Sequence, residues 1–234
     1  MNAACLAPQL LDANGARVVL GAQVGAPVEP IAARADTLFG PRGACLAGPQ
    51  GPLFVCDTGH HRVLVWREAP RGDGIPADAV IGHADLCTEG RGTLNMPSSV
   101  ATEDGVLAVA DSWNHRVLLW RDLRRCHEPP DLVLGDDLFW CYGVTLHHGR
   151  IFVADTGNRR VLVWDRIPRS GAARPDRRLV GEMRWPHAVA CAGELIFVAD
   201  AGAGILAWKR WVPVGFTAER LTPYGVVVCG EELC

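Results

Sequence analysis

The sequence predicts an all-β protein: a single β-propeller domain over residues 1–234, built of five four-stranded blades. Three observations predict it. One phrase of 14 residues occurs four times, each copy closes on a tryptophan, and the copies recur at a nearly constant distance. The closing tryptophans, Trp66, Trp120, Trp164 and Trp208, are 54, 44 and 44 residues apart. Periods of about 40 to 50 residues that contain several short strands are typical of propeller blades.

The repeated phrase indicates two strands joined by a tight polar turn. Its clearest copy is "IFVADTGNRRVLVW" (151–164), and the others are "LFVCDTGHHRVLVW" (53–66), "LAVADSWNHRVLLW" (107–120) and the looser "LIFVADAGAGILAW" (195–208). Asp, Asn, Ser, Thr and Gly favour the turn because they bond nearby amides or accept left-handed backbone. The residues that follow alternate with period two, as in a half-buried strand.

Each repeat is predicted to form four strands. The inner strand follows a Pro-x-Gly-like entry, the second strand ends at an aspartate, the third ends near the tryptophan, and the outer strand ends in glycine. The expected inner strands are 41–47, 97–103, 141–147 and 186–192, and the aspartates are Asp57, Asp111, Asp155 and Asp200. The outer phrases are "AVIG" (79–82), "LVLG" (132–135) and "RLVG" (178–181). The fourth repeat lacks such a phrase, so residues 212–221 are expected to provide its outer strand.

The two ends of the chain are predicted to share the fifth blade. "ARVVLG" (16–21) reads as an outer strand, and "TPYGVVVCGEELC" (222–234) reads as an inner strand with the start of a second. Pairing these ends would close the ring and hide the sheet edges. We expect five blades, with six as the alternative count.

The turn motif resembles the NHL repeat, named for its Asn-His-Leu signature. Asp-x-x-Asn-x-Arg stands at 111–116 and 155–160; the first repeat has His60 in place of the asparagine, and the fourth loses both the asparagine and the arginine. The resemblance implies a propeller that serves as a protein-interaction platform, an RNA-binding surface or, occasionally, an enzyme such as the metal-dependent lyase that finishes peptide amidation. We expect the repeated aspartates and arginines to serve turns and blade packing rather than catalysis.

Composition narrows the classes of partner. The 234 residues carry a net charge of −3, which favours neither a nucleic acid nor a membrane. The N-terminal residues lack the basic start and apolar core of a secretory signal, and no stretch reaches the roughly 18 apolar residues of a membrane span, so a cytoplasmic location is expected. The nine cysteines stand singly with no C-x-x-C pair, so we predict neither a disulfide framework nor a closed zinc site, and no cofactor.

Candidate functional residues lie where the repeats differ. The residue after each entry proline is expected to line the mouth of the central channel, and a bulky Trp113 replaces the usual glycine of the turn. Exposed aromatic residues with an arginine are typical of interface hot spots. We therefore predict that a protein or peptide partner binds on this face, without catalysis. The predicted partner-binding residues are Arg42, Ser98, Trp113, Trp140, Cys141, Tyr142, Trp185, His187 and Tyr224.

Two alternatives remain open. Cys141 and His187 could act as nucleophile and base or as metal ligands, with Tyr142 and Tyr224 beside them; this would make the protein a metal- or cofactor-binding protein or an enzyme with a lyase- or hydrolase-like activity. His60, His61 and His115 are candidates for a third ligand. The arginine-rich stretches 121–130 and 166–178 could instead contact RNA, although acidic residues interrupt them. The oligomeric state is not predicted.

Overall fold

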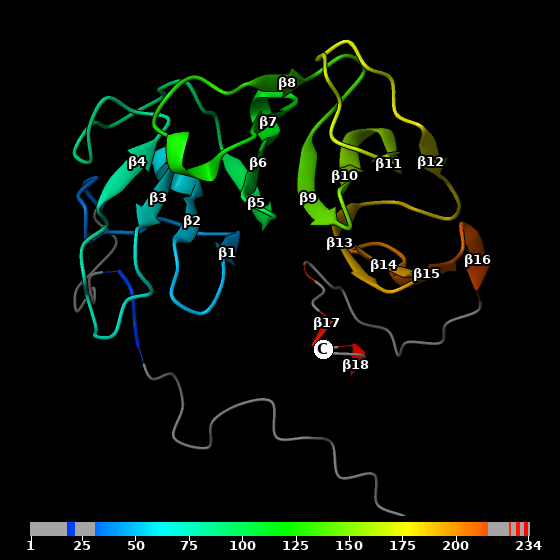
Figure 1. Cartoon of the computed structure of the whole chain (residues 1–234), viewed down its shortest axis with the longest axis horizontal. Coiled ribbons are helices and arrows are strands. Elements are labelled where there is room, and N and C mark those ends of the chain that lie inside the picture. Colours follow the sequence, from blue (N-terminus) through cyan, green and yellow to red (C-terminus); the bar gives the residue numbers. More distant parts are fainter. Residues whose placement is uncertain (1–17, 22–30, 215–224, 226–227, 230–231, 234) are drawn as a thin grey trace, which may run out of the picture.

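The described part of the protein contains four four-stranded antiparallel sheets and one two-stranded sheet (Figure 1). The computed structural model describes residues 18–21, 31–214, 225, 228–229 and 232–233. The first sheet contains β1 (Ala44–Leu46), β2 (Leu53–Asp57), β3 (Arg62–Trp66) and β4 (Ala79–Ile81). The second contains β5 (Pro97–Glu103), β6 (Val106–Asp111), β7 (Arg116–Trp120) and β8 (Leu132–Leu134). The third contains β9 (Cys141–His147), β10 (Arg150–Asp155), β11 (Arg160–Trp164) and β12 (Arg177–Leu179). The fourth contains β13 (Pro186–Ala192), β14 (Leu195–Asp200), β15 (Gly204–Lys209) and β16 (Val212–Val214).

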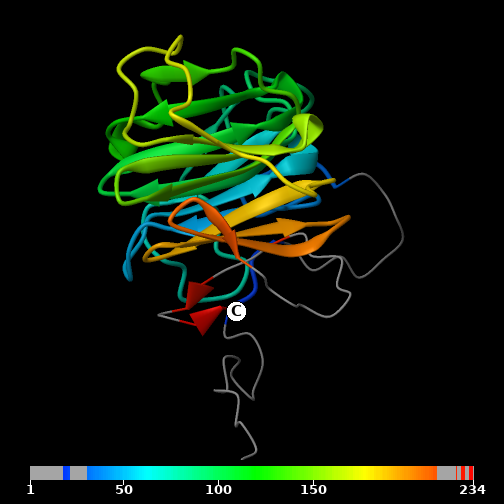
Figure 2. The same cartoon turned by 90° about the vertical axis from the view of Figure 1, so that its right-hand side faces the viewer.

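The sheets follow one another around a common centre. Their first strands β1, β5, β9 and β13 lie innermost and contact one another in that order (Figure 1). Seen from the side, the antiparallel strands of the four sheets lie along one axis, so their ends gather on two opposite faces (Figure 2). We call the face where the inner strands begin, beside Asp155 and its equivalents, the upper face. The lower face is the opposite one, where His147 pairs with Arg150.

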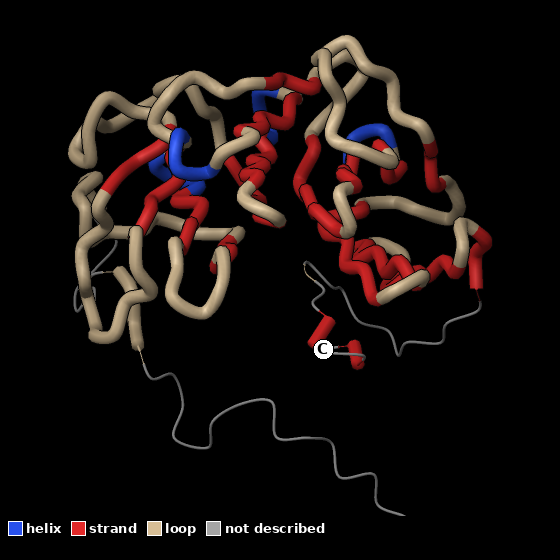
Figure 3. The backbone as a smooth tube through the Cα atoms, in the orientation of Figure 1, coloured by secondary structure: helices blue, strands red, loops and turns tan. Residues whose placement is uncertain are grey.

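The predicted strand pattern is confirmed in all four repeats. The inner strands β5, β9 and β13 coincide with the expected ranges, while β1 is shorter than the expected 41–47. β16 pairs with β15, which confirms the outer strand predicted after the fourth tryptophan for its first three residues; residues 215–221 lie outside the described part. The described helices are single 3-10 turns, η1 (Thr58–His60), η2 (Ser112–Asn114), η3 (Leu123–Arg125) and η4 (Thr156–Asn158) (Figure 3). None of the helices described here is long and apolar enough to cross a membrane.

The core consists of apolar layers between successive sheets. Trp120 belongs to the layer between the first and second sheets, Trp164 to the next layer, and Trp208 to the layer between the third and fourth sheets. These three tryptophans therefore fill the space between neighbouring sheets. Trp66 occupies the matching place on the outer side of the first sheet, where it packs with Leu20 and Leu38.

The chain ends are described only in part. β17 (Val228–Cys229) pairs with β18 (Glu232–Leu233), and β17 contacts β13. Residues 18–21 form no strand; Val19 donates its N–H to Asp73 Oδ1 at 2.7 Å and accepts from Gly74 N at 2.9 Å, both in the β3–β4 connection. The remainder of the predicted end strands lies outside the described residues. The shared fifth blade thus stays a prediction.

Candidate functional site

A buried aspartate fixes the loop that enters each blade on the upper face. In the third sheet, Asp155 is fully buried; its Oδ1 accepts from Phe139 N at 2.8 Å, and its Oδ2 accepts from Asn158 Nδ2 at 3.0 Å and Arg160 Nε at 2.6 Å. Asp57 and Asp111 bond in the same way to the loop amides of Phe39 and Asn95 and to the Nε atoms of Arg62 and Arg116. These side chains are engaged in holding loops, which accords with the packing role expected for them.

In the fourth sheet, backbone amides of the described residues hydrogen-bond to the buried aspartate without the help of an asparagine or arginine side chain. Asp200 is fully buried although its repeat has lost the asparagine and the arginine. Its Oδ1 accepts from Gly202 N and Ala203 N, both at 2.8 Å, and its Oδ2 accepts from Arg184 N at 2.7 Å. The one-residue deletion brings these turn amides onto the carboxylate, so the degenerate repeat still satisfies its buried charge.

The residue after the entry position is the extra residue of a β-bulge. The pairing of the inner with the second strand skips Ser98, Tyr142 and His187 in their respective sheets. A bulge leaves one residue outside the ladder and redirects its side chain. This local irregularity turns these three side chains away from the regular alternation of the strand.

The bulge residues meet across the centre of the upper face. Ser98 Oγ donates to the carbonyl of Tyr142 at 2.6 Å, and the Tyr142 ring lies 5.1 Å from the His187 ring. The Arg42 guanidinium, from the first sheet, lies 5.7 Å from the centroid of the Tyr142 ring. The structure thus gathers the four described mouth residues, whereas Tyr224 lies outside the described residues.

Burial corrects two of the predicted contact residues. Ser98 is 7% exposed, and its hydroxyl also contacts the Ser112 hydroxyl; Cys141 is fully buried. Both positions were expected to face a partner, but their side chains are enclosed by neighbouring blades. Arg42 is exposed, and Tyr142 and His187 are half-buried, so these three remain accessible from the upper face.

The arrangement does not favour Cys141 as a nucleophile. Its thiol donates to the Arg116 carbonyl at 3.3 Å, and burial, with Asp155 and Asp111 nearby, raises the pKa of the thiol well above its usual range. His187 Nδ1 faces the Trp185 carbonyl at 2.7 Å, and burial lowers the pKa of this imidazole. Cys141 is therefore a protonated, enclosed thiol.

The three candidate ligand histidines serve the loop network instead. His60 takes the place of the repeat asparagine, with Nδ1 2.8 Å from Asp57 Oδ2. The Nδ1 atoms of His61 and His115 accept from Met96 N and Trp140 N of the following blade, each at 3.1 Å. Among the residues that the structure describes, no three His, Cys, Asp or Glu side chains gather as a metal site.

Aromatic side chains cover the upper face, one half-exposed ring from each sheet. Trp113 lies 6.3 Å from Trp140, which stacks on Phe139 at 4.9 Å with an interplanar angle of 12°. The exposed fractions are 48% for Phe39, 49% for Trp113, 42% for Phe139 and 48% for Trp185. Phe39 and Phe139 were not among the predicted residues.

Where the entry loop carries a phenylalanine, the turn packed against it carries a glycine, and where the turn carries a tryptophan, the loop has no aromatic residue at that position. A Cβ at Gly157 would collide with the Phe139 ring and would lie 2.7 Å from its carbonyl oxygen; Gly59 meets Phe39 in the same way. In the second sheet the loop residue is Asn95, and the turn carries Trp113. A phenylalanine two residues before the entry position, together with a glycine in the turn, is the sequence signal that would have predicted the exposed rings of Phe39 and Phe139.

We expect Cys141 to resist alkylation in the folded protein. Cys87 is exposed and serves as the internal reference, whereas Cys56 and Cys141 are fully buried. Because labelling of a buried thiol requires local opening, iodoacetamide at pH 8 should modify Cys141 at least ~100-fold more slowly than Cys87. Peptide mass spectrometry after timed labelling measures both rates. Comparable rates would show that the thiol is accessible and would revive the nucleophile hypothesis.

Comparisons with known proteins agree with the predicted NHL-like repeat. The NHL repeat family model matches residues 40–66 and 94–118, which confirms the resemblance over these two segments. No curated protein matches the sequence. Hydrazine synthase of Kuenenia stuttgartiensis is structurally similar, with a TM-score of 0.57 at 15% sequence identity over 83% of this chain. The match covers 52% of that chain, so this protein spans about half of its length, and at this identity the likeness concerns the fold alone.

Proposed function

From its NHL repeats and its four like sheets, we propose that the protein is a five-bladed propeller whose upper face binds a protein or peptide partner. The observation that carries the proposal is the set of half-exposed rings, one from each sheet, on the same face as the Arg42, Tyr142 and His187 group. Large aromatic residues with an arginine supply most of the binding energy in many interfaces. A surface that concentrates them suits recognition of another chain.

Burial at both ends of the sheet series supports a fifth blade. Leu64 and Trp66, on the outer side of the first sheet, are buried with Leu20. On the fourth sheet, Ala199 and Ala207 are buried, although no further four-stranded sheet follows among the residues that the structure describes. Residues 18–21 approach the first sheet and β17 approaches the fourth, which is the arrangement that a blade shared between the ends requires.

The fixed loops support recognition as the mechanism. Each entry loop is tied through its backbone amide to a fully buried carboxylate, so the aromatic rings are held before a partner arrives. Binding to a preorganised surface loses less loop entropy than binding to a mobile one. In this proposal, the repeated motif holds the entry loops in place, and the variable loop residues contact the partner.

The Trp113→Ala/Trp185→Ala double variant is expected to lose the partner while keeping the fold. Hot-spot side chains are each worth about 2 kcal/mol or more, so affinity should fall at least ~100-fold. Pull-down from native extract with wild type and variant identifies the partner, and titration calorimetry with the purified partner measures the change.

The matched control is Val133→Ala/Val212→Ala, which removes exposed apolar side chains from the outer strands β8 and β16. This control should recover the partner as well as wild type does. Equal affinity of the tryptophan variant and wild type would contradict the proposed upper-face site, provided that both retain the same far-UV circular dichroism.

A further inference from the structure

His60, in the turn of the first sheet, stands where the second and third turns carry an asparagine. In the third sheet, Asn158 Nδ2 donates to Asp155 Oδ2 and to the carbonyl of Asp137, each at 3.0 Å. Asn114 makes the same pair of bonds in the second sheet, at 2.8 and 3.4 Å. One amide group thus supplies both donors, and it ties the buried carboxylate of the turn to the loop that enters the blade.

The imidazole of His60 also lies between two acceptors, one in the turn and one in the segment that enters the first blade. Its Nδ1 is 2.8 Å from Asp57 Oδ2, and its Nε2 is 2.6 Å from the carbonyl oxygen of Ile31. A neutral imidazole has one N–H and one lone pair, so it can donate to only one of these oxygens and would turn its lone pair toward the other. The imidazolium, with two N–H groups, donates to both. The geometry therefore selects the protonated ring.

The ring is enclosed among charged groups of both signs. His60 is 7% exposed, and the Asp57 carboxylate beside it is fully buried. Arg62 shares this carboxylate through its Nε at 2.7 Å, and its charge opposes a second cation at the same place. The charge-assisted hydrogen bond to Asp57 and the bond to the Ile31 carbonyl act in the opposite direction. Protonation of the ring therefore depends on keeping both of these bonds.

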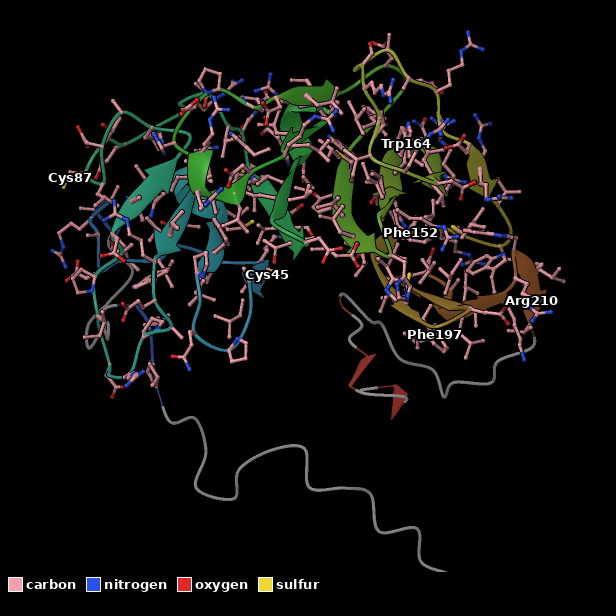
Figure 4. All side chains as sticks on the ribbon, viewed as in Figure 1. Cys45, Cys87, Phe152, Trp164, Phe197 and Arg210 are labelled. Atoms are coloured by element: carbon pink, nitrogen blue, oxygen red, sulfur yellow. The ribbon has the colours of Figure 1, made fainter. Side chains whose placement is uncertain are left out.

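The β4–β5 connection, in which Cys87 is labelled in Figure 4, also packs on this group. The carbonyl of His60 accepts from His83 Nε2 at 3.0 Å, and Glu89 Oε1 accepts from Ala33 N of the entry segment at 3.2 Å. The remaining charged or titratable groups around the cluster are Arg34, Asp36, His61 and Arg91. None of these groups hydrogen-bonds to a ring nitrogen of His60, so its two printed acceptors decide the state of the ring.

Ile31 stands at the start of the segment that leads into the first blade. Further along this segment, the carbonyl of Arg34 accepts from Arg62 Nη2 at 2.8 Å, and Phe39 N donates to Asp57 Oδ1 at 2.6 Å. These bonds need no protonated imidazole, whereas the bond to the Ile31 carbonyl does. Loss of the proton therefore removes the contact at the start of the segment and leaves the later ones in place.

We propose that His60 is a pH-sensitive switch, which holds the start of this segment while its ring is protonated and releases it when the ring loses a proton. The bound state carries a proton that the released and unfolded states do not need. The stabilisation is therefore present at acid pH and is lost as the pH rises. Histidine is the side chain that changes its charge between about pH 5 and 8. The switch acts within the first blade, so it does not depend on the partner proposed above.

His60→Asn tests the switch, because asparagine is the residue of the second and third turns and an amide keeps its donors at any pH. Urea unfolding of the full chain at about pH 5.5 and about pH 8.5, at constant ionic strength, compares the variant with wild type. The unfolding equilibrium constant of wild type should rise at least ~10-fold more over this interval than that of His60→Asn. The control is His127→Gln, which removes an exposed histidine and should keep the wild-type dependence.

Two further measurements need only the wild-type protein, so they decide the question even if the variant does not fold. In ¹⁵N spectra of the imidazole rings at about pH 5.5, both ring nitrogens of His60 should carry a proton. Hydrogen exchange of the Ala33 amide, corrected for its intrinsic pH dependence, should lose at least ~10-fold of its protection at about pH 8.5, because this amide lies two residues after Ile31.

The proposal is overturned by any of four results. These are a neutral His60 ring at about pH 5.5 in the folded protein, constant protection of the Ala33 amide, equal pH dependence of wild type and a folded His60→Asn variant, or loss of the wild-type dependence in His127→Gln.

Discussion

Replacing Asp57 with alanine is expected to lower the free energy of unfolding by about 3–5 kcal/mol, because it leaves a buried arginine without its counter-ion. The side chain of Arg62 is fully buried, and its Nε lies 2.7 Å from Asp57 Oδ2. The other guanidinium nitrogens bond backbone carbonyls, at 2.6 Å to Leu86 and 2.8 Å to Arg34, which stabilise the charge but do not neutralise it. Removal of the carboxylate also frees the amide of Phe39 and with it the entry loop of the first blade.

Asp111→Ala is the matched control, because it removes the same group from the second sheet. Its partner Arg116 is 32% exposed, so water can replace part of the lost interaction. We expect a loss of about 1–3 kcal/mol for this variant. Urea unfolding followed by far-UV circular dichroism measures both changes. Equal losses would mean that burial of the arginine does not set the cost.

A double variant separates the charge from the loop contact. Asp57→Ala/Arg62→Met removes the buried charge together with its partner, so it should recover part of the stability lost by Asp57→Ala alone. It also keeps the test available if the single variant does not fold. A double variant less stable than the single one would contradict the explanation.

Local sequence signals account for how well the strands could be predicted. A proline, an aspartate, a tryptophan and a glycine each mark a position where the backbone must turn, cap or fill space. They recur in the same order, except that the third repeat has Cys141 in place of the proline and the fourth lacks the outer phrase that ends in glycine. β9 begins and ends at the residues that the phrase predicts, even though its entry residue is Cys141 instead of proline. The pattern of the other repeats predicts β9, whereas the entry residue Cys141 alone does not.

The direction of side chains could not be predicted so well. The strand pattern places Ser98, Tyr142 and His187 in the ladder, but a bulge takes each of them out of it. Whether a redirected side chain is exposed then depends on the neighbouring blade: Ser98 is covered, whereas Tyr142 and His187 are not. That information is tertiary, and no single repeat contains it.

The contact between the third and fourth sheets illustrates the same limit. His147 ends an inner strand, and Trp211, 64 residues further along the chain, packs against the guanidinium groups of Arg150 and Arg177 of the preceding sheet. Sequence periodicity identifies the sheets that face each other, but it does not show which side chains meet across their contact.

Replacing Trp120 with alanine is expected to cost about 3–5 kcal/mol of unfolding free energy. The side chain is 2% exposed and packs in the layer between the first and second sheets, where alanine would leave a cavity. The indole also ties down a long connection, since its Nε1 donates to the carbonyl of Glu128 at 2.9 Å, between β7 and β8. Loss of the ring therefore affects the packing between two sheets and the path of the outer strand together.

Substitution by phenylalanine distinguishes these two contributions. Trp120→Phe retains most of the buried ring but leaves the carbonyl of Glu128 without its donor. Trp208 is as well buried, yet its indole nitrogen makes no hydrogen bond within the described residues, because only the short turn at Arg210 and Trp211 joins β15 to β16. Trp120→Phe should therefore cost about 1 kcal/mol more than Trp208→Phe, as expected for one buried hydrogen bond. Urea unfolding of the two variants measures the difference in lost free energy of unfolding. A difference of zero would mean that the tryptophan stabilises each sheet through its volume alone. Other contacts would then hold the connection between the third and fourth strands.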